Sequence, residues 1–228
     1  MLGQRDSDGL LIRDYNMKLY EVKTLQIQAI KVIRFARFCD HRGYFTEYYR
    51  KSDFENHAEM AFMKDVEFVQ CNESYSKKGT VRGLHFQWNP YMGKLARTLT
   101  GRMIDMALDI RKGSPTFGKI ILYDMPADHK ADYAEWIWVP PGFAHGNLFT
   151  EDTMIEYFCS GEYNPDCEAG ISSLAEDIDW TVCDASLKRL FDSIAPSTSL
   201  ISHKDKNGLS VNEWNRDERS NNFVYGRL

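Results

Sequence analysis

The sequence lacks the features that mark membrane, secreted and zinc-binding proteins. No apolar run in its 228 residues approaches the length that spans a membrane. The N-terminus, MLGQRDSDGLLIRDYNMKLYEV, has no apolar core of the kind found in signal peptides. The five cysteines are scattered, odd in number and never arranged as CxxC, which argues against a disulfide framework and a zinc knuckle. These absences predict a protein of the reducing cytoplasm with no membrane partner.

The charge pattern excludes a second class of partner. The formal net charge is −5, and the chain contains no basic run that could follow a phosphate backbone. Nucleic acid is therefore not an expected partner. An anionic ligand would have to be held by a few placed arginines and not by a general positive field.

The chain is instead rich in short segments of β-branched and aromatic residues, separated by glycine and proline at close intervals. Many short strands with frequent turn signals predict an all-β sandwich or barrel. RMIDMALDI also suits a helix by composition, but its position between two turn signals favours a strand. The predicted strands include residues 25–38 and the segments VRGLHFQ, KLARTLT, RMIDMALDI, KIILYDM, EWIWVP and TMIEYFCS.

The predicted organisation has three parts. Residues 1–17 are polar and suggest a flexible N-terminal arm, and residues 18–182 form the β-domain. Residues 183–228 are expected to form a C-terminal helix and a polar tail that packs on the domain. In that part, DASLKRLFDSIAP suits one helix with Asp184 as its N-cap and Pro196 past its end.

A histidine in the strand-like stretch GTVRGLHFQ (residues 79–87) is the first candidate for chemistry. Taken alone, His85 suits an edge strand or a core histidine bonded to a carbonyl. Arg82 and His85 point to opposite sides of a regular strand unless a bulge at Gly83 re-aims one of them. His145, in PPGFAHGN, is a possible companion. A metal site is not expected, because Gln87 stands where a metal-binding cupin would place a ligand and no acid follows at a suitable spacing.

Metal-free proton chemistry is the alternative interpretation. Histidine can remove a proton next to a carbonyl, and a lysine such as Lys94 can stabilise the enolate that forms. Tyr157 or Tyr163 could return a proton to the opposite face. Each of these residues, considered by itself, is more often structural.

Six segments carry a pattern in a fixed order: DHRGYFTEYY, QCNESYSKKGTVRGLHFQ, GKL, DMALDIRKGSPTFG, PPGFAHGN and EYFCSGEYNPDCEAGI. Together they resemble the dTDP-4-dehydrorhamnose 3,5-epimerase family. The resemblance runs from about residue 25 to residue 180. It implies a cupin-like jelly roll with a few short helices, a homodimer, no metal or other cofactor, and a nucleotide-linked 4-keto-6-deoxyhexose as substrate.

The resemblance also implies roles for individual residues. His85 matches the family's catalytic base, Tyr157 its acid, and Lys94 the lysine beside the keto oxygen. The remaining matches are to substrate-binding or active-site residues: Arg82 and His145 near the sugar and pyrophosphate; Arg42, Phe45 and Glu47 near the nucleotide, partly across the dimer; Gln70 and Asn72 also near the nucleotide; Asp105 as a buried acid; and Glu168 as a further binding acid.

Three departures from the family pattern fall at the sugar end. The aspartate that orients the catalytic histidine is expected near residues 173–175, where the sequence is Ser-Leu-Ala. Either Glu176 or Asp177 replaces it from a reshaped loop, or the histidine works without that partner. Glu162 stands in place of a second tyrosine, and Asn147 in place of an aromatic residue. A non-rhamnose sugar, such as another deoxyhexose or a heptose, is therefore compatible with the sequence.

The leading hypothesis is an epimerase that inverts C3, C5 or both. A 3,4-keto-isomerase or other tailoring enzyme on the same scaffold, and a non-catalytic nucleotide-sugar binding module, are the alternatives. The sequence leaves open whether the nucleotide is dTDP, GDP or another.

Overall fold

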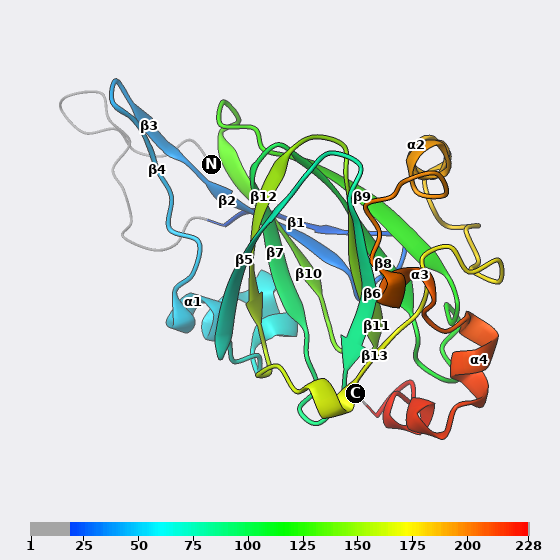
Figure 1. The fold of residues 1–228 in the computed structure, drawn as a ribbon. Helices are drawn as coiled ribbons and strands as arrows, with labels where there is room; N and C mark the ends of the chain where they lie inside the picture. The colour runs from blue at the N-terminus through cyan, green and yellow to red at the C-terminus, as the bar shows by residue number, and fades with distance from the viewer. Residues whose placement is uncertain (1–18, 228) are drawn as a thin grey trace.

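The computed structural model describes residues 19–227 as a β-sandwich with short helices on both outer faces (Figure 1). The larger sheet has six strands in the order β1-β2-β10-β7-β12-β5, and the smaller has five in the order β13-β6-β11-β8-β9. All pairings in the two sheets are antiparallel. The arm predicted for residues 1–17 lies outside the described residues.

The strands of the six-stranded sheet are β1 (Leu19–Thr24), β2 (Lys31–Ala36), β10 (Tyr133–Val139), β7 (Lys94–Thr100), β12 (Thr153–Cys159) and β5 (Gln70–Ser76). Those of the five-stranded sheet are β13 (Glu168–Gly170), β6 (Val81–Gln87), β11 (Phe143–Phe149), β8 (Arg102–Asp109) and β9 (Ile120–Pro126). A separate hairpin, β3 (Phe38–Asp40) and β4 (Gly43–Phe45), projects from the sandwich (Figure 1).

Three apolar layers hold the fold together. The layer between the sheets joins residues such as Ala96 and Ile137 of one sheet to Ala107 and Phe149 of the other. On the outer face of the six-stranded sheet, α1 (Lys51–Asn56) and the 3₁₀ helix Ala58–Met63 cover Trp136 and its neighbours. Burial of this apolar surface is the main stabilising contribution to such a fold.

The C-terminal region forms the third layer, against the outer face of the five-stranded sheet. It contains α2 (Ala185–Ile194), α3 (His203–Lys206), α4 (Val211–Arg216) and the 3₁₀ helix Glu218–Asn222. Trp214 and Phe223 are 0% and 1% exposed there and pack around Phe86 of β6. This region, predicted as a helix and a polar tail that packs on the domain, therefore also supplies part of the core.

Most predicted elements are confirmed. The jelly-roll class holds, RMIDMALDI is strand β8, and Asp184 caps a helix that ends at Ile194. The prediction for residues 25–38 is wrong in part, since strand β2 begins at Lys31 and β3 at Phe38. Leu25, Ile27 and Ile30 are buried in a turn instead, so their apolar pattern reflects burial and not strand alternation. Within residues 19–227, no helix has the length and apolar character needed to cross a membrane.

Candidate active site

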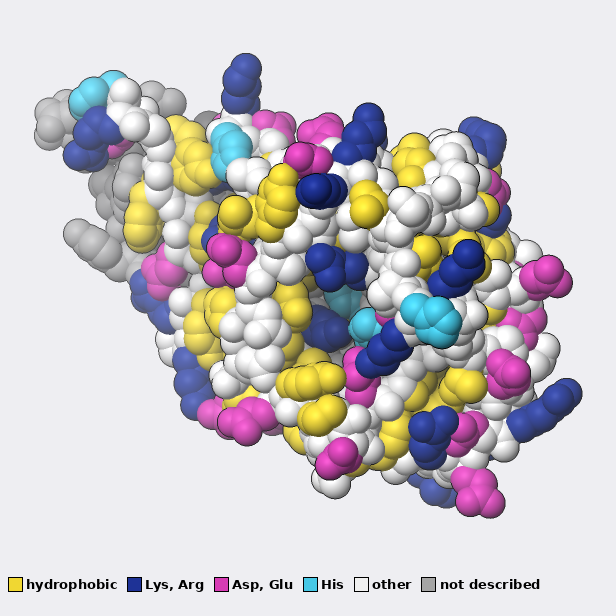
Figure 2. All heavy atoms as spheres, viewed as in Figure 1, with side chains coloured by type: hydrophobic (Ala, Val, Ile, Leu, Met, Phe, Trp, Pro, Cys, Tyr) yellow, Lys and Arg dark blue, Asp and Glu magenta, His cyan; other side chains and the backbone are white. Residues whose placement is uncertain are grey.

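A cavity of about 440 Å³ opens between the two sheets and adjoins an inner cavity of about 210 Å³. Four side chains line both: His85 and His145 from the five-stranded sheet, and Lys94 and Tyr157 from the six-stranded sheet. In Figure 2 the larger cavity is a hollow near the middle of the face, with basic and histidine side chains inside. The sequence predicted these four residues as one group, and the structure brings them together.

A bulge in β6 aims two of its polar residues into the same space. His85 pairs with His145 of β11, and Arg82 pairs with Asn147, so β6 has one residue more than β11 between the two pairs. Gly83 in this bulge has φ +91, and a Cβ there would lie 2.6 Å from the His145 carbonyl oxygen. Glycine is therefore required. Arg82 and His85 both line the inner cavity, as the predicted bulge at Gly83 allows.

His85 is held by a carboxylate from the C-terminal region. Its Nε2 lies 2.7 Å from Oδ1 of Asp205 in α3, whose other oxygen accepts from Gly83 N at 3.3 Å. Burial by itself would raise the pKa of Asp205, but the hydrogen bond and charge of His85 hold that pKa below its usual value. The ionised carboxylate accepts the Nε2 proton, which leaves the lone pair of His85 on Nδ1.

The expectation that Glu176 or Asp177 orients His85 is wrong. Asp177 accepts from the backbone N–H groups of Val211 and Asn212 and so caps α4, while Glu176 is exposed. The reshaped loop around residues 173–177 thus anchors the C-terminal region, and that region delivers the carboxylate from α3.

One local signal for Asp205 existed, and it indicated a different role. Ser202 precedes Asp205 by three residues, the spacing of a helix N-terminal capping motif. Ser202 Oγ does accept from Asp205 N at 3.0 Å. The Asp205 side chain, however, turns to His85, which is 120 residues away in the sequence.

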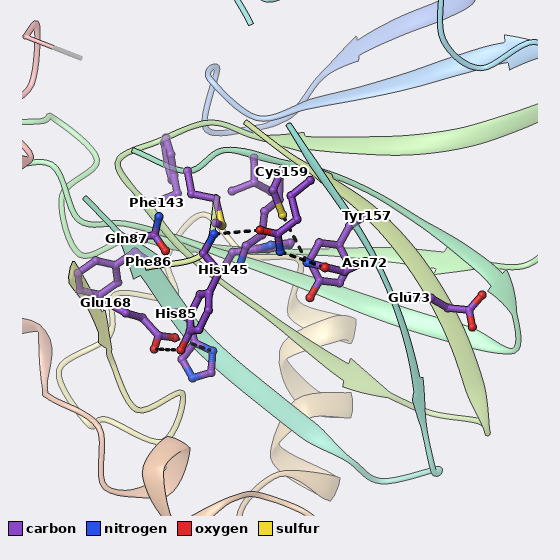
Figure 3. Close-up of a pocket in the computed structure, with 15 residues that line it drawn as sticks. Asn72, Glu73, His85, Phe86, Gln87, Phe143, His145, Tyr157, Cys159 and Glu168 are labelled. Atoms are coloured by element: carbon purple, nitrogen blue, oxygen red, sulfur yellow. Dashed lines mark hydrogen bonds and ion pairs between the residues drawn. The ribbon is translucent and has the colours of Figure 1, made fainter. Parts of the chain in front are cut away.

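Glu168 of β13 lies near Nδ1, the other ring nitrogen of His85. Its Oε1 is 3.8 Å from His85 Nδ1, while Oε2 accepts from Lys204 at 2.7 Å and from the Tyr163 hydroxyl at 3.1 Å. Burial alone would raise the pKa of Glu168, but Lys204 and His85 keep it below the usual value. Figure 3 shows Glu168 beside the His85 ring. An imidazolium formed at His85 would thus lie between two carboxylates.

His145 has a carboxylate of its own. Its Nε2 is 2.6 Å from Oδ2 of Asp105, which is 1% exposed and also accepts from Asn147 Nδ2 at 3.1 Å. Asp105 thus orients His145 from beneath the cavity. Asn147, which replaces a family aromatic residue, forms part of this network and lines the inner cavity.

Lys94 and Tyr157 lie on the facing sheet, with Lys94 Nζ 5.9 Å from the centre of the Tyr157 ring. Burial lowers the pKa of Lys94 and raises that of Tyr157. Among the described residues, no carboxylate lies within 4.0 Å of Lys94 Nζ. The site therefore presents the amino group of Lys94, which has no carboxylate partner in the described part of the chain, and a phenol that keeps its proton.

The predicted nucleotide residues are divided between two places. Gln70 and Asn72 line the larger cavity, with Gln70 Nε2 donating to Asn72 Oδ1 at 3.0 Å. Arg42, Phe45 and Glu47 do not line it; they lie on or just after the projecting hairpin, and Phe45 is 64% exposed. Glu47 pairs with Arg50 at 2.6 Å. Their predicted role is thus not formed within one chain.

Across residues 19–227, no three His, Cys, Asp or Glu side chains are grouped in a way that could hold a metal ion.

Comparisons with known proteins agree with this arrangement. The sequence model of the dTDP-4-dehydrorhamnose 3,5-epimerase family matches residues 24–213. The dTDP-4-dehydrorhamnose 3,5-epimerase of Sinorhizobium fredii is 38% identical over 180 residues, which cover 77% of this chain and 88% of that protein.

Two solved structures have the same architecture. A dTDP-6-deoxy-D-glucose-3,5-epimerase from Legionella pneumophila, in complex with dTDP-4-keto-L-rhamnose, is 30% identical with a TM-score of 0.70, covering 84% of this chain and 93% of its own. A 3'-monoepimerase from Streptomyces bikiniensis, in complex with dTDP-quinovose, is 27% identical with a TM-score of 0.68, covering 83% and 87%.

Proposed function

Because the chain belongs to the dTDP-4-dehydrorhamnose 3,5-epimerase family, we propose that it inverts C3, C5 or both of a dTDP-linked 4-keto-6-deoxy sugar, in the biosynthesis of activated deoxysugars such as dTDP-rhamnose. The observation that carries the proposal is the pairing of His85 Nε2 with Asp205 at 2.7 Å. With Nε2 paired in this way, Nδ1 of His85 is available as a base, and Lys94 and Tyr157 lie across the cavity from His85. The reaction needs nothing beyond these groups.

The first step is removal of a proton next to the keto group. His85 accepts the C–H proton at Nδ1, and the electron pair of that bond moves to the carbonyl oxygen as an enolate. Asp205 and Glu168 stabilise the imidazolium. Lys94 lacks a carboxylate within 4.0 Å among the described residues, and in its protonated form it stabilises the enolate oxygen.

The second step is return of a proton to the other face. Tyr157 projects from the six-stranded sheet, whereas His85 projects from the five-stranded sheet. A sugar between the sheets therefore meets the base on one side and the phenol on the other. Tyr157 gives its proton to the carbanionic carbon, the carbonyl reforms, and the configuration is inverted.

Proton NMR of dTDP-4-keto-6-deoxyglucose in D2O tests the proposal. Wild-type protein is expected to introduce deuterium at C3, C5 or both, and His85→Ala to introduce none. Full exchange in His85→Ala would exclude His85 as the base, and no exchange in wild type would contradict this activity on this substrate.

The same spectra separate the remaining alternatives. Deuterium at C3 alone would indicate a monoepimerase, the activity of the S. bikiniensis relative. Movement of the carbonyl from C4 to C3 would indicate a keto-isomerase, and tight binding without deuterium uptake a binding module. GDP-linked and heptose substrates extend the panel, since Asn147 and Glu162 replace aromatic residues of the family pattern.

We also propose a cytoplasmic homodimer in which Arg42, Phe45 and Glu47 reach the cavity of the partner. Phe45 on the projecting hairpin supports this, because it stacks on Phe38 yet stays 64% exposed, and an exposed aromatic side chain gains stability when a partner buries it. Sedimentation equilibrium is expected to give twice the chain mass of 26.5 kDa. A monomer with full activity would contradict the shared site. Cell fractionation tests the location.

A further inference from the structure

Residues 214–227, here called the terminal segment, lie beyond the range that the family model matches. They begin in α4, continue through the 3₁₀ helix Glu218–Asn222 and end beside the loop after β8. We infer that the terminal segment is a positioning element that holds two walls of the nucleotide-sugar cavity and so sets the affinity for substrate. This inference rests on the proposed function.

The first wall is the loop between β6 and β7, residues 88–93. It joins the strand that carries His85 to Lys94, the first residue of β7, and contributes Met92 to the cavity lining. The terminal segment holds this loop from outside. The Tyr91 hydroxyl donates to the Asn222 carbonyl at 2.7 Å.

Aromatic packing adds to that contact. The Phe223 ring lies 5.6 Å from the Tyr91 ring and 6.4 Å from the Trp88 ring, both nearly edge-on. Trp214 packs against Trp88 at 6.5 Å and against Phe86 at 4.6 Å. Phe86 follows His85 directly in β6, so one strand turns His85 toward the cavity and Phe86 toward the terminal segment.

The second wall is Phe143, the first residue of β11, which lines the larger cavity. The Arg111 guanidinium lies between two rings, 4.4 Å from the centre of Phe143 and 5.1 Å from that of Tyr225. Arg111 is itself fixed by the buried Asp109 at 2.7 Å. Phe143, Arg111 and Tyr225 thus form a stack in which Phe143 lines the cavity and Tyr225 is the outer ring.

Backbone pairing fixes Tyr225 in that stack. Lys112 N donates to the Phe223 carbonyl at 2.7 Å, and Tyr225 N donates to the Lys112 carbonyl at 3.0 Å. Lys112 Nζ also donates to Asn221 Oδ1 at 3.1 Å. The terminal segment is therefore bound to the loop that carries Arg111 on both sides of Val224, while the Tyr225 ring is 49% exposed and can be changed without opening the core.

Two substitutions test the inference, one for each wall. Tyr225→Ala removes the outer ring of the stack, and Tyr91→Phe removes the hydroxyl contact while keeping the ring. Each is expected to raise KM roughly two- to fivefold, the effect of one cation–π contact or hydrogen bond, with kcat within about twofold of wild type. Tyr225→Phe keeps the stack and is expected to restore the wild-type KM.

Tyr20→Ala is the matched control, since Tyr20 is 56% exposed and packs at a tilt against Tyr133, the first residue of β10. An unchanged KM in both test variants, with or without a lower melting temperature, would overturn the inference, as would a loss in kcat at constant KM. Calorimetry on the same variants measures the Kd of dTDP and so tests the effect on affinity without catalysis. A wild type that binds dTDP but exchanges no hydrogen would contradict the proposed function alone.

Discussion

The two sheets prepare the proposed catalytic groups by different physical means. On the five-stranded sheet, each histidine is tied to a carboxylate, His85 to Asp205 at 2.7 Å and His145 to Asp105 at 2.6 Å. On the six-stranded sheet, burial shifts the pKa of Lys94 down and that of Tyr157 up. The five-stranded sheet, the base side, thus depends on specific hydrogen bonds, and the six-stranded sheet, the acid side, depends on desolvation.

This difference determines what a substitution should do on each side. On the base side, replacing a carboxylate oxygen of Asp205 with an amide nitrogen changes which ring nitrogen of His85 carries the proton. On the acid side, a change of side chain affects the fate of the enolate after it has formed. Exchange of hydrogen and inversion of configuration can be measured separately, so the two sides can be tested independently.

Asp205→Asn should have the largest effect. The amide can donate to Nε2 of His85, which favours the tautomer with its proton on Nδ1 and removes the base. We expect kcat to fall by roughly 10²- to 10⁴-fold with little change in KM. The rate of deuterium uptake measures this.

Asp177→Asn is the control for that experiment, because Asp177 anchors the same C-terminal region at α4 without contacting His85. It is expected to lower the melting temperature but to leave kcat within about threefold of wild type. A wild-type rate of uptake in Asp205→Asn would show that the pairing has no role in proton removal.

Tyr157→Phe should separate exchange from inversion. His85 still removes the proton and returns deuterium from solvent on the same face, whereas the phenol needed on the other face is gone. We expect inversion to fall by roughly 10²-fold or more while exchange continues at a much smaller loss. NMR of sugar configuration and of deuterium content in one sample gives both rates, and an equal loss in both would contradict the division of roles.

The sequence could predict the parts of the site that are local in the chain. GTVRGLHFQ, GKL and PPGFAHGN each place their functional side chain on a strand between turn signals, so His85, Lys94 and His145 could be placed before the structure. Asp205 could not, because α3 reaches His85 only through the packing of the C-terminal region on β6. Arg42, Phe45 and Glu47 stay predictions, since their role requires a second chain.

The fold shows the same limit. Strands with β-branched residues between glycines were predicted well, since their signal is contained in about seven residues. The buried role of Trp214 and Phe223 was missed because single apolar residues in a charged stretch carry no periodicity. Their burial follows from an apolar surface on the five-stranded sheet, which is a property of the assembled fold.

The pH profile should show the effect of desolvation on Lys94. Because its pKa lies below the ordinary value for lysine, raising the pH through that lowered value removes the charge that stabilises the enolate. Tyr157, whose pKa is raised, keeps its proton over the same range. We expect kcat to fall on the alkaline side below the pH at which a free lysine titrates, and Lys94→Arg to lose that fall because arginine stays charged. An identical alkaline fall in Lys94→Arg would assign it to another group.

Glu168→Gln should have the smallest effect on the base side. Glu168 is 3.8 Å from His85 Nδ1 and makes no hydrogen bond to it, so its negative charge contributes without fixing the tautomer. Since Lys204 and Tyr163 share that charge, we expect a loss in kcat of roughly three- to tenfold, well below that of Asp205→Asn. Glu176→Gln, at an exposed position, is the control and should stay within about twofold. If Glu168→Gln lost as much as Asp205→Asn, the histidine would need both carboxylates equally, and hydrogen-bonded tautomer control could not explain the base side.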